Sequence, residues 1–274
     1  MRVERHDTGH ARWEVARREA APALRPFVGA ALEGWAQSQG RPSRLREVPF
    51  PGVPLIFNLG SEWVIESDRH DSFVAGLHDV PTVVGGAPTW ACIELRLTPL
   101  GAHRVLRLPM HELTNCVVEL EDVLPGAREL TDRLRETPDW GERFDQVEAF
   151  LARRLARSPA PSPEIEWSWR ELARSGGRVR IAALVEEVGW SPRRLIERFR
   201  EQIGLTPKAA AAVIRFDRAA GALRAAEPPS LASLAYSCGY ADQAHLNRDF
   251  RRFAGTTPSA FLTSVTEAGG IAAA

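Results

Sequence analysis

The chain has 274 residues, 35 basic and 35 acidic side chains, and a hydrophobic fraction of 44%. This length predicts two domains, and the apolar fraction supplies a hydrophobic core for each, which excludes a mainly disordered chain. No run of about eighteen apolar residues occurs, so the sequence excludes a membrane-spanning helix and predicts no membrane partner.

The cysteine pattern and the N-terminus indicate the compartment. Cys92, Cys116 and Cys238 are odd in number and far apart in the chain. They do not form a disulfide framework, and such a pattern is typical of a reducing compartment. Residues 1–18 are charged throughout and lack the apolar core of a signal peptide. We therefore expect a cytoplasmic protein.

Residues 1–157 are predicted to form an N-terminal domain rich in β-structure. We expect residues 1–20 to be a polar lead-in and residues 23–35 to form a short helix, because apolar side chains recur there at mostly helical spacing. From residue 48 onward, short apolar runs are separated by turn residues, as in a sheet of short strands. Strands are expected at residues 53–59, 63–65, 73–77, 80–84 and 91–97.

The last of these strands shows the clearest period. Ile93, Leu95 and Leu97 alternate with Glu94 and Arg96, as in a strand with one buried face. Several short strands at about ten-residue spacing predict a cupin-like or jelly-roll-like fold. The predicted fold class of the chain is therefore α+β, with a β-rich N-terminal domain followed by an all-α C-terminal domain.

Helical periodicity returns after Pro125 and provides accessory helices at residues 127–135 and 140–155. The second helix carries an apolar stripe, which either packs on the N-terminal domain or forms a homodimer interface. The stripe consists of Phe144, Val147, Phe150, Leu151 and Leu155. The alternating prolines of residues 158–163 then predict an extended linker between the domains.

Residues 164–262, the predicted C-terminal domain, contain one pattern twice. The first copy comprises Ile181, Leu184, Gly189, Trp190, Leu195, Phe199, Gly204, Thr206 and Pro207. The second comprises Leu231, Leu234, Gly239, Tyr240, Leu246, Phe250, Gly255, Thr257 and Pro258. Most spacings agree to the residue, which indicates a repeated structural unit. Residues 263–274 are small and polar, and we expect a disordered tail.

Each copy predicts two helices around a tight turn. Gly189 and Gly239 lie where the first helix must end, since glycine tolerates the positive φ of that position. Ser191 and Asp242 are plausible N-caps for the second helix. A short helix, a glycine turn and a second helix are typical of the helix-turn-helix motif. A long helix after Pro207, to about residue 226, joins the two units and spans roughly 27 Å.

The outer faces of the second helices predict double-stranded DNA as a partner. Arginine can bond guanine, and glutamine or asparagine can bond adenine. Residues 178–262 carry 13 basic and 8 acidic side chains, whereas the preceding residues have an acidic excess, so the basic charge is confined to the repeat. The predicted base contacts are Arg193, Arg194, Gln243, His245 and Arg248, with Asn247 beside them. The predicted phosphate or supporting contacts are Arg198, Arg200, Lys208, Arg251 and Arg252.

This segment resembles the DNA-binding domain of the AraC/XylS family of transcriptional regulators. The resemblance rests on the runs 189–191, 204–208, 238–240 and 255–258, and the second unit resembles the family pattern more closely. It implies a sequence-specific regulator controlled by a small-molecule effector or a partner, with a homodimer and, for an activator, RNA polymerase as further partners. Two departures are Val185, where the family has a small residue, and Glu197 on the first recognition helix.

The run from Pro99 to Leu120 resembles the end of an N-terminal domain that precedes this DNA-binding domain in many bacterial regulators. That resemblance implies regulation but gives no ligand. Aromatic side chains in the sheet either fill the core or line an effector pocket. The candidate effector-binding residues are Phe57, Trp63, Trp90 and His103.

Catalytic and metal-binding patterns are weak. His70, His78 and His103 lie in the N-terminal region without metal-ligand spacing, and no phosphate loop or nucleophile elbow occurs. We therefore expect no catalytic residue, no metal and no cofactor. Two alternatives stay open: a cupin-like metal-dependent enzyme anchored to DNA by its C-terminal domain, and a protein adaptor that has lost DNA recognition through Val185 and Glu197.

Overall fold

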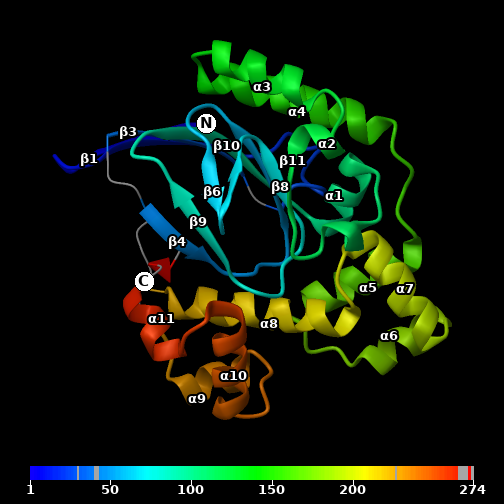
Figure 1. Ribbon diagram of the computed structural model, residues 1–274. Helices are drawn as coiled ribbons and strands as arrows, with labels where there is room; N and C mark the ends of the chain where they lie inside the picture. The colour runs from blue at the N-terminus through cyan, green and yellow to red at the C-terminus, as the bar shows by residue number, and fades with distance from the viewer. Residues whose placement is uncertain (30, 40–42, 226, 265–270, 273–274) are drawn as a thin grey trace.

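Two antiparallel sheets form the N-terminal part of the computed structural model, which describes residues 1–29, 31–39, 43–225, 227–264 and 271–272 (Figure 1). The larger sheet has the order β1-β2-β3-β10-β5-β8-β11. Its strands are β1 (Arg2–Asp7), β2 (Arg12–Arg18), β3 (Leu32–Gln39), β5 (Val53–Asn58), β8 (Phe73–Ala75), β10 (Trp90–Leu97) and β11 (Val117–Glu119). The smaller sheet consists of β12 (Ile271–Ala272), β4 (Ser43–Glu47), β9 (Thr82–Gly86), β6 (Trp63–Ile65) and β7 (Asp68–His70).

The first forty residues correct two predictions. Residues 1–20 are not a lead-in, because β1 and β2 pair in register from Arg2 opposite Arg17 to Asp7 opposite Arg12. Residues 23–35 are not a helix: a run of turns precedes β3, which pairs with β2 and β10. Leu24 and Leu32 are buried, so the apolar positions were recognised correctly. Pairing of β3 with β2 and β10 therefore determined the conformation of this segment, although the local spacing of its apolar residues favours a helix.

The accessory helices cover the outer face of the larger sheet (Figure 1). They are α1 (Pro99–Leu106), the 3-10 helix η1 (Met110–Leu113), α2 (Leu120–Val123), α3 (Ala127–Glu136) and α4 (Trp140–Ala156). The ring of Trp140 lies so close to Gly34 on β3 that a Cβ there would be 2.5 Å from it. The apolar stripe of α4 is buried in the core of the chain itself, which confirms the first of its two predicted roles.

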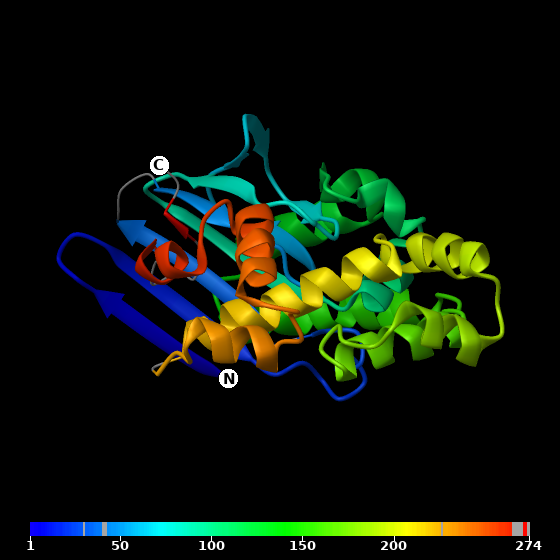
Figure 2. The same ribbon diagram turned by 90° about the horizontal axis from the view of Figure 1, so that it is seen from below.

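The C-terminal part is all-α, as predicted. Its helices are α5 (Pro163–Arg174), α6 (Ile181–Val188), α7 (Pro192–Ile203), α8 (Pro207–Leu223), α9 (Leu231–Ser237), α10 (Gln243–Ala254) and α11 (Pro258–Ser264). The long helix α8 has α5–α7 at one end and α9–α11 at the other (Figures 1 and 2). Among the described residues no helix is long and apolar enough to cross a membrane.

The two parts are docked against each other. On the α7 side, Thr114 Oγ1 donates to the carbonyl oxygen of Gly204 at 2.8 Å. On the α10 side, Arg252 forms an ion pair with Asp79. One continuous hydrophobic core runs from the larger sheet through the accessory helices into the helix-turn-helix units. The helical units therefore do not hang free on the predicted linker.

Both boundary segments, the predicted linker and the predicted tail, contact the rest of the chain. Pro163 of the predicted linker is the first residue of α5, where its fixed φ suits a helix start. Arg104 ties the linker to α1 by donating to the carbonyl oxygens of Leu155 at 2.8 Å and Ser158 at 3.3 Å. In the tail that was expected to be disordered, residues 271–272 pair with β4, while residues 265–270 and 273–274 lie outside the described residues.

Candidate DNA-binding face and ligand cavity

Both helix-turn-helix units have the predicted caps. The Ser191 side chain accepts a hydrogen bond from the backbone N–H of Arg194 at 3.2 Å, and Asp242 accepts one from that of His245 at 2.6 Å. Gly189 and Gly239 have φ values of 65° and 79°, which side chains other than glycine rarely adopt. The half-buried Val185 stands in α6 without disturbing this turn.

The two recognition helices, α7 and α10, bury equivalent faces. Leu195 and Phe199 of α7 are fully buried, as are Leu246 and Phe250 of α10. Residues two and five positions after Leu195 or Leu246 lie on the opposite, outer side of their helix. Counted from these leucines, Glu197 of α7 is equivalent to Arg248 of α10, and Arg200 is equivalent to Arg251. The repeat therefore places a carboxylate in the first unit where the second has a guanidinium.

The predicted DNA contacts on α7 are exposed, but two of them are already paired. Arg193 Nε lies 2.7 Å from Glu197 Oε1, and Arg198 pairs with Glu201. The Arg194 guanidinium lies over the Trp190 ring, 4.5 Å from its centroid. Arg200 and Lys208 are exposed and form no ion pair with any described residue.

The outer face of α10 has fewer of its predicted DNA contacts in ion pairs than the outer face of α7, as judged from the described residues. Gln243, Arg248 and Arg251 are exposed, and neither arginine forms an ion pair within the described part of the chain. Asn247 and His245 are half-buried, and His245 lies edge-on to the Tyr240 ring with centroids 5.1 Å apart. Arg252 contacts the N-terminal part through Asp79 and stacks on Phe253. A phosphate contact by Arg252 stays a prediction and would require this ion pair to break.

A cavity of about 1060 Å³ lies between the two sheets. β10 contributes Cys92, Glu94 and Arg96, the alternate positions to the buried Ile93, Leu95 and Leu97. The face of β10 that the sequence marks as polar thus faces the cavity. Asp217 of α8 and Arg224, the C-cap of this helix, also line the cavity, so its wall includes the helix that joins the two DNA-binding units.

Two of the four candidate effector residues line this cavity. Trp63 and Trp90 do so, with ring centroids 5.0 Å apart. Phe57 does not, because strand alternation turns it into the core while its neighbour Ile56 faces the cavity. His103 lies on α1, where its Nδ1 is 3.2 Å from the carbonyl oxygen of Leu108. Sequence reasoning missed Glu47, Arg96, Asp217 and Arg224.

These four residues place both acidic and basic side chains on the wall of the cavity. Arg96 Nε bonds Glu94 Oε1 at 2.7 Å, and its guanidinium lies 5.1 Å from the centroid of the Phe50 ring. Burial raises the pKa of the Glu47 carboxyl, and Glu94 raises it further. Burial likewise raises the pKa of Asp217. Of these charged residues, only Glu94 and Arg96 had a sequence signal, which was the alternation along β10.

The candidate metal ligands have other partners. His70 Nδ1 lies 2.9 Å from Glu119 Oε1, and His78 Nδ1 lies 2.7 Å from the carbonyl oxygen of Gly76. His103 is on α1, as described above. Throughout the described ranges, no three His, Cys, Asp or Glu side chains are grouped so that they could hold a metal ion.

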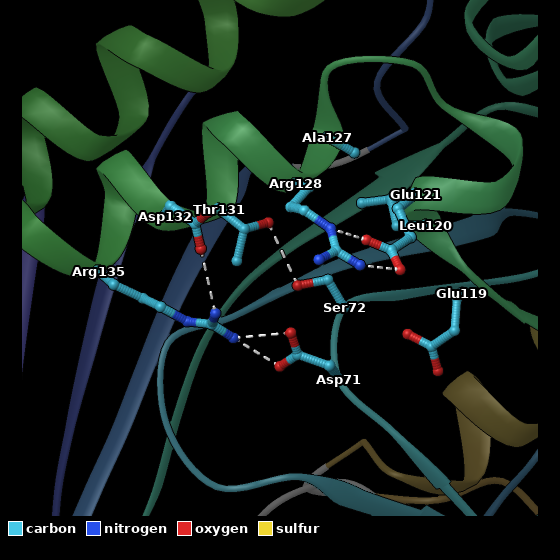
Figure 3. Close-up of a pocket in the computed structure, with 10 residues that line it drawn as sticks. All are labelled: Asp71, Ser72, Glu119, Leu120, Glu121, Ala127, Arg128, Thr131, Asp132 and Arg135. Atoms are coloured by element: carbon cyan, nitrogen blue, oxygen red, sulfur yellow. Dashed lines mark hydrogen bonds and ion pairs between the residues drawn. The ribbon is translucent and has the colours of Figure 1, made fainter.

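A smaller pocket of about 230 Å³ lies between α3, the start of α2 and the residues Asp71 and Ser72 before β8 (Figure 3). Most of its charged side chains pair with one another, and Glu119 pairs with His70 outside the pocket. Arg135 Nη2 bonds Asp71 Oδ1 at 2.6 Å, and Arg128 pairs with Glu121 (Figure 3). Ser72 and Thr131 share a hydrogen bond of 3.3 Å across the pocket. These contacts hold α3 on the sheet and leave little unsatisfied polarity for a ligand.

Comparisons with known proteins agree with this architecture. Residues 184–264 match the model of a helix-turn-helix domain, and residues 16–119 match a domain of unknown function (DUF6597). The fold and the matched domains define a DNA-binding transcriptional regulator. The C-terminal part of the chain carries a helix-turn-helix domain of the AraC type. No curated protein matches the chain significantly.

Solved structures with a similar arrangement share little sequence. A ToxT variant from Vibrio cholerae strain SCE256 is 13% identical, with 91% of this chain and 100% of that chain covered and a TM-score of 0.48. ToxT of the same strain bound to an unsaturated fatty acid is 14% identical, with 82% and 91% covered and a TM-score of 0.45. The AraC-like activator CuxR is 15% identical, with 72% and 79% covered and a TM-score of 0.32.

Replacing Glu197 with glutamine is expected to strengthen binding to DNA of any sequence by about 0.5–1 kcal/mol at low salt. The change removes a negative charge from the outer face of α7 and releases Arg193 from its ion pair. The dependence of affinity on salt should steepen by about one phosphate contact. Fluorescence anisotropy over a salt series measures both quantities.

The matched control is Glu187→Gln, which removes an exposed carboxylate from α6 and not from the recognition helix. A selective loss of operator binding in Glu197→Gln would contradict the prediction. It would show that Glu197 accepts a hydrogen bond from a base amino group.

Proposed function

We propose that this regulator binds specific DNA sequences through α7 and α10, and that a ligand in the large cavity controls this binding. The observation that carries the proposal is the shared wall of the cavity. β4 and β10 of the N-terminal sheets line it together with Asp217 of α8 and Arg224 at the C-terminal end of that helix. A ligand there touches the helix on which both helix-turn-helix units are mounted.

The proposed base contacts come mainly from the second unit. Arg248 is exposed and forms no ion pair with a described residue, so its guanidinium is available for bidentate contact with guanine, and Gln243 stands in the first turn of the same helix. Arg251, Arg200 and Lys208 are proposed to contact phosphates. In the first unit, Arg193 and Arg194 are proposed to reach base edges, and Arg193 must first part from Glu197.

The coupling between ligand and DNA is proposed to act through the docking contacts. Thr114 and Asp79 hold the two ends of the DNA-binding part against the N-terminal part. A ligand that shifts α8 changes how these contacts position α7 and α10. Coupling between two sites is reciprocal, so operator DNA should alter the affinity for the ligand by the same factor.

The test is DNA binding by the full chain over a salt series, with DNA from upstream of its own gene compared with unrelated DNA. Binding that is tighter to the upstream DNA and survives unrelated competitor supports a sequence-specific regulator. Equal binding to both, repeated across a genomic DNA library, would contradict it. The same assay with purified protein at rising concentration reports whether a homodimer binds, and added RNA polymerase reports whether that partner joins.

A further inference from the structure

The large cavity is lined by aromatic side chains and by charged side chains, only some of which form ion pairs with other described residues. Six aromatic side chains of the described part of the chain line it, contributed by both sheets and by the loop before β5. They are Trp13, Trp35, Phe50, Trp63, Phe73 and Trp90. This lining suits a ligand with an apolar body, and the volume of about 1060 Å³ is at the upper end for a small-molecule site.

The arginines of the wall already have partners. Arg96 bonds Glu94 at 2.7 Å, and Arg17 Nε lies 2.8 Å from Glu33 Oε1. The Arg17 guanidinium also lies 5.5 Å from the centroid of the Trp35 ring. The Arg224 guanidinium lies 5.1 Å from the centroid of the Phe261 ring. An anionic ligand would have to compete with these contacts.

Two carboxylates of the wall have no such partner. Among the described residues, neither Glu47 on β4 nor Asp217 on α8 forms a hydrogen bond or an ion pair within 4.0 Å. Glu47 is exposed and lines the cavity, whereas Asp217 is half-buried on the wall of the same cavity. Arg96 and Arg224 act on both carboxylates only at longer range. An ionised carboxylate in this position gains from a cation brought into the cavity.

Charge and aromatic lining favour the same ligand. Among the described residues, four carboxylates and three guanidinium groups line the wall, and aromatic faces attract cations within about 6 Å of their centroids. A neutral ligand would leave Glu47 and Asp217 uncompensated, and an anion would face four carboxylates. We infer that the cavity binds an organic cation with a bulky apolar or aromatic body, whose charge is held by Glu47 and Asp217. This inference rests on the proposed ligand site.

The probe pair for the test is tetraphenylphosphonium and tetraphenylborate, which share shape and apolar surface and differ in the sign of their charge. Titration of the full chain without DNA, followed by calorimetry and by quenching of tryptophan fluorescence, measures both affinities. We expect one tetraphenylphosphonium per chain, bound at least about tenfold more tightly than tetraphenylborate. Equal or tighter binding of the anion, or no binding of the cation, would overturn the inference.

Variants locate the charge contact. Glu47→Gln and Asp217→Asn should each weaken tetraphenylphosphonium binding by about tenfold and leave tetraphenylborate unchanged or tighter. The matched control Glu136→Gln removes an exposed carboxylate from α3, outside the cavity, and should change neither affinity. Thermal unfolding of each variant confirms that it is folded. An unchanged cation affinity in both folded cavity variants would overturn the assignment.

The experiments distinguish a failure of the proposed ligand class from a failure of the proposed control of DNA binding. If tetraphenylphosphonium binds in a Glu47-dependent manner but leaves operator affinity unchanged, the ligand class stands and effector control is refuted. If the upstream DNA is not recognised at all, the titrations without DNA still decide the ligand class.

Discussion

The Phe216→Ala variant is expected to lose about 3–5 kcal/mol of unfolding free energy, because it leaves a large cavity beneath α8. Phe216 is fully buried, and its ring centroid lies 5.0 Å from that of Phe250 and 5.1 Å from that of Phe253. These contacts fix the second recognition helix on the helix that joins the two units. Urea unfolding followed by circular dichroism measures the loss.

The control for this variant is Tyr236→Ala, which truncates an aromatic residue of α9 that is 87% exposed. A surface change of this kind should cost no more than about 0.5 kcal/mol. If Phe216→Ala cost as little, α10 would be held on α8 by contacts other than this aromatic cluster.

The Arg248→Ala variant should weaken binding to the operator by about 1–3 kcal/mol and relax selectivity at one base pair. Arg248 is exposed on α10, diametrically opposite the buried Leu246, and no described carboxylate pairs with it. Competition binding against operators mutated one base pair at a time measures the loss of selectivity.

Two comparisons make the Arg248 experiment decisive. Arg251→Ala should weaken binding to all sequences alike and reduce the salt dependence by about one phosphate, as a backbone contact does. Arg133→Ala removes an exposed arginine from α3 and should have no effect. A uniform loss in Arg248→Ala, equal on all operators, would show that Arg248 contacts phosphate and reads no base.

Local sequence signals predicted the DNA-binding part accurately. Ser191 and Asp242 cap the helices that the spacing predicted, and Leu195, Phe199, Leu246 and Phe250 are fully buried. These features depend on neighbours within about four residues, so their physics is contained in a short stretch of chain. The base contacts that were predicted on the same helices stay predictions.

The candidate ligand site was predicted only in part. Trp63 and Trp90 line the cavity, but Phe57 and His103 do not. The alternation along the sequence predicts that Glu94 and Arg96 form the polar face of a strand, directed away from the core. The sheet β4-β9-β6-β7 lies across it and encloses the space between. A strand period tells which residues share a face but not what lies opposite that face.

The sequence by itself determined the repeated helix-turn-helix units, the long helix between them and the strands β5, β6, β8, β9 and β10. Each of these follows from spacing, caps and turn residues close together in the chain. Only the tertiary structure decided that residues 1–39 form three strands, because their partners and the accessory helix α4 come from distant segments. It also decided that Glu47 of β4 and Asp217 of α8, 170 positions apart in the chain, line one cavity. Burial of a shared core, which no local pattern encodes, brought them together.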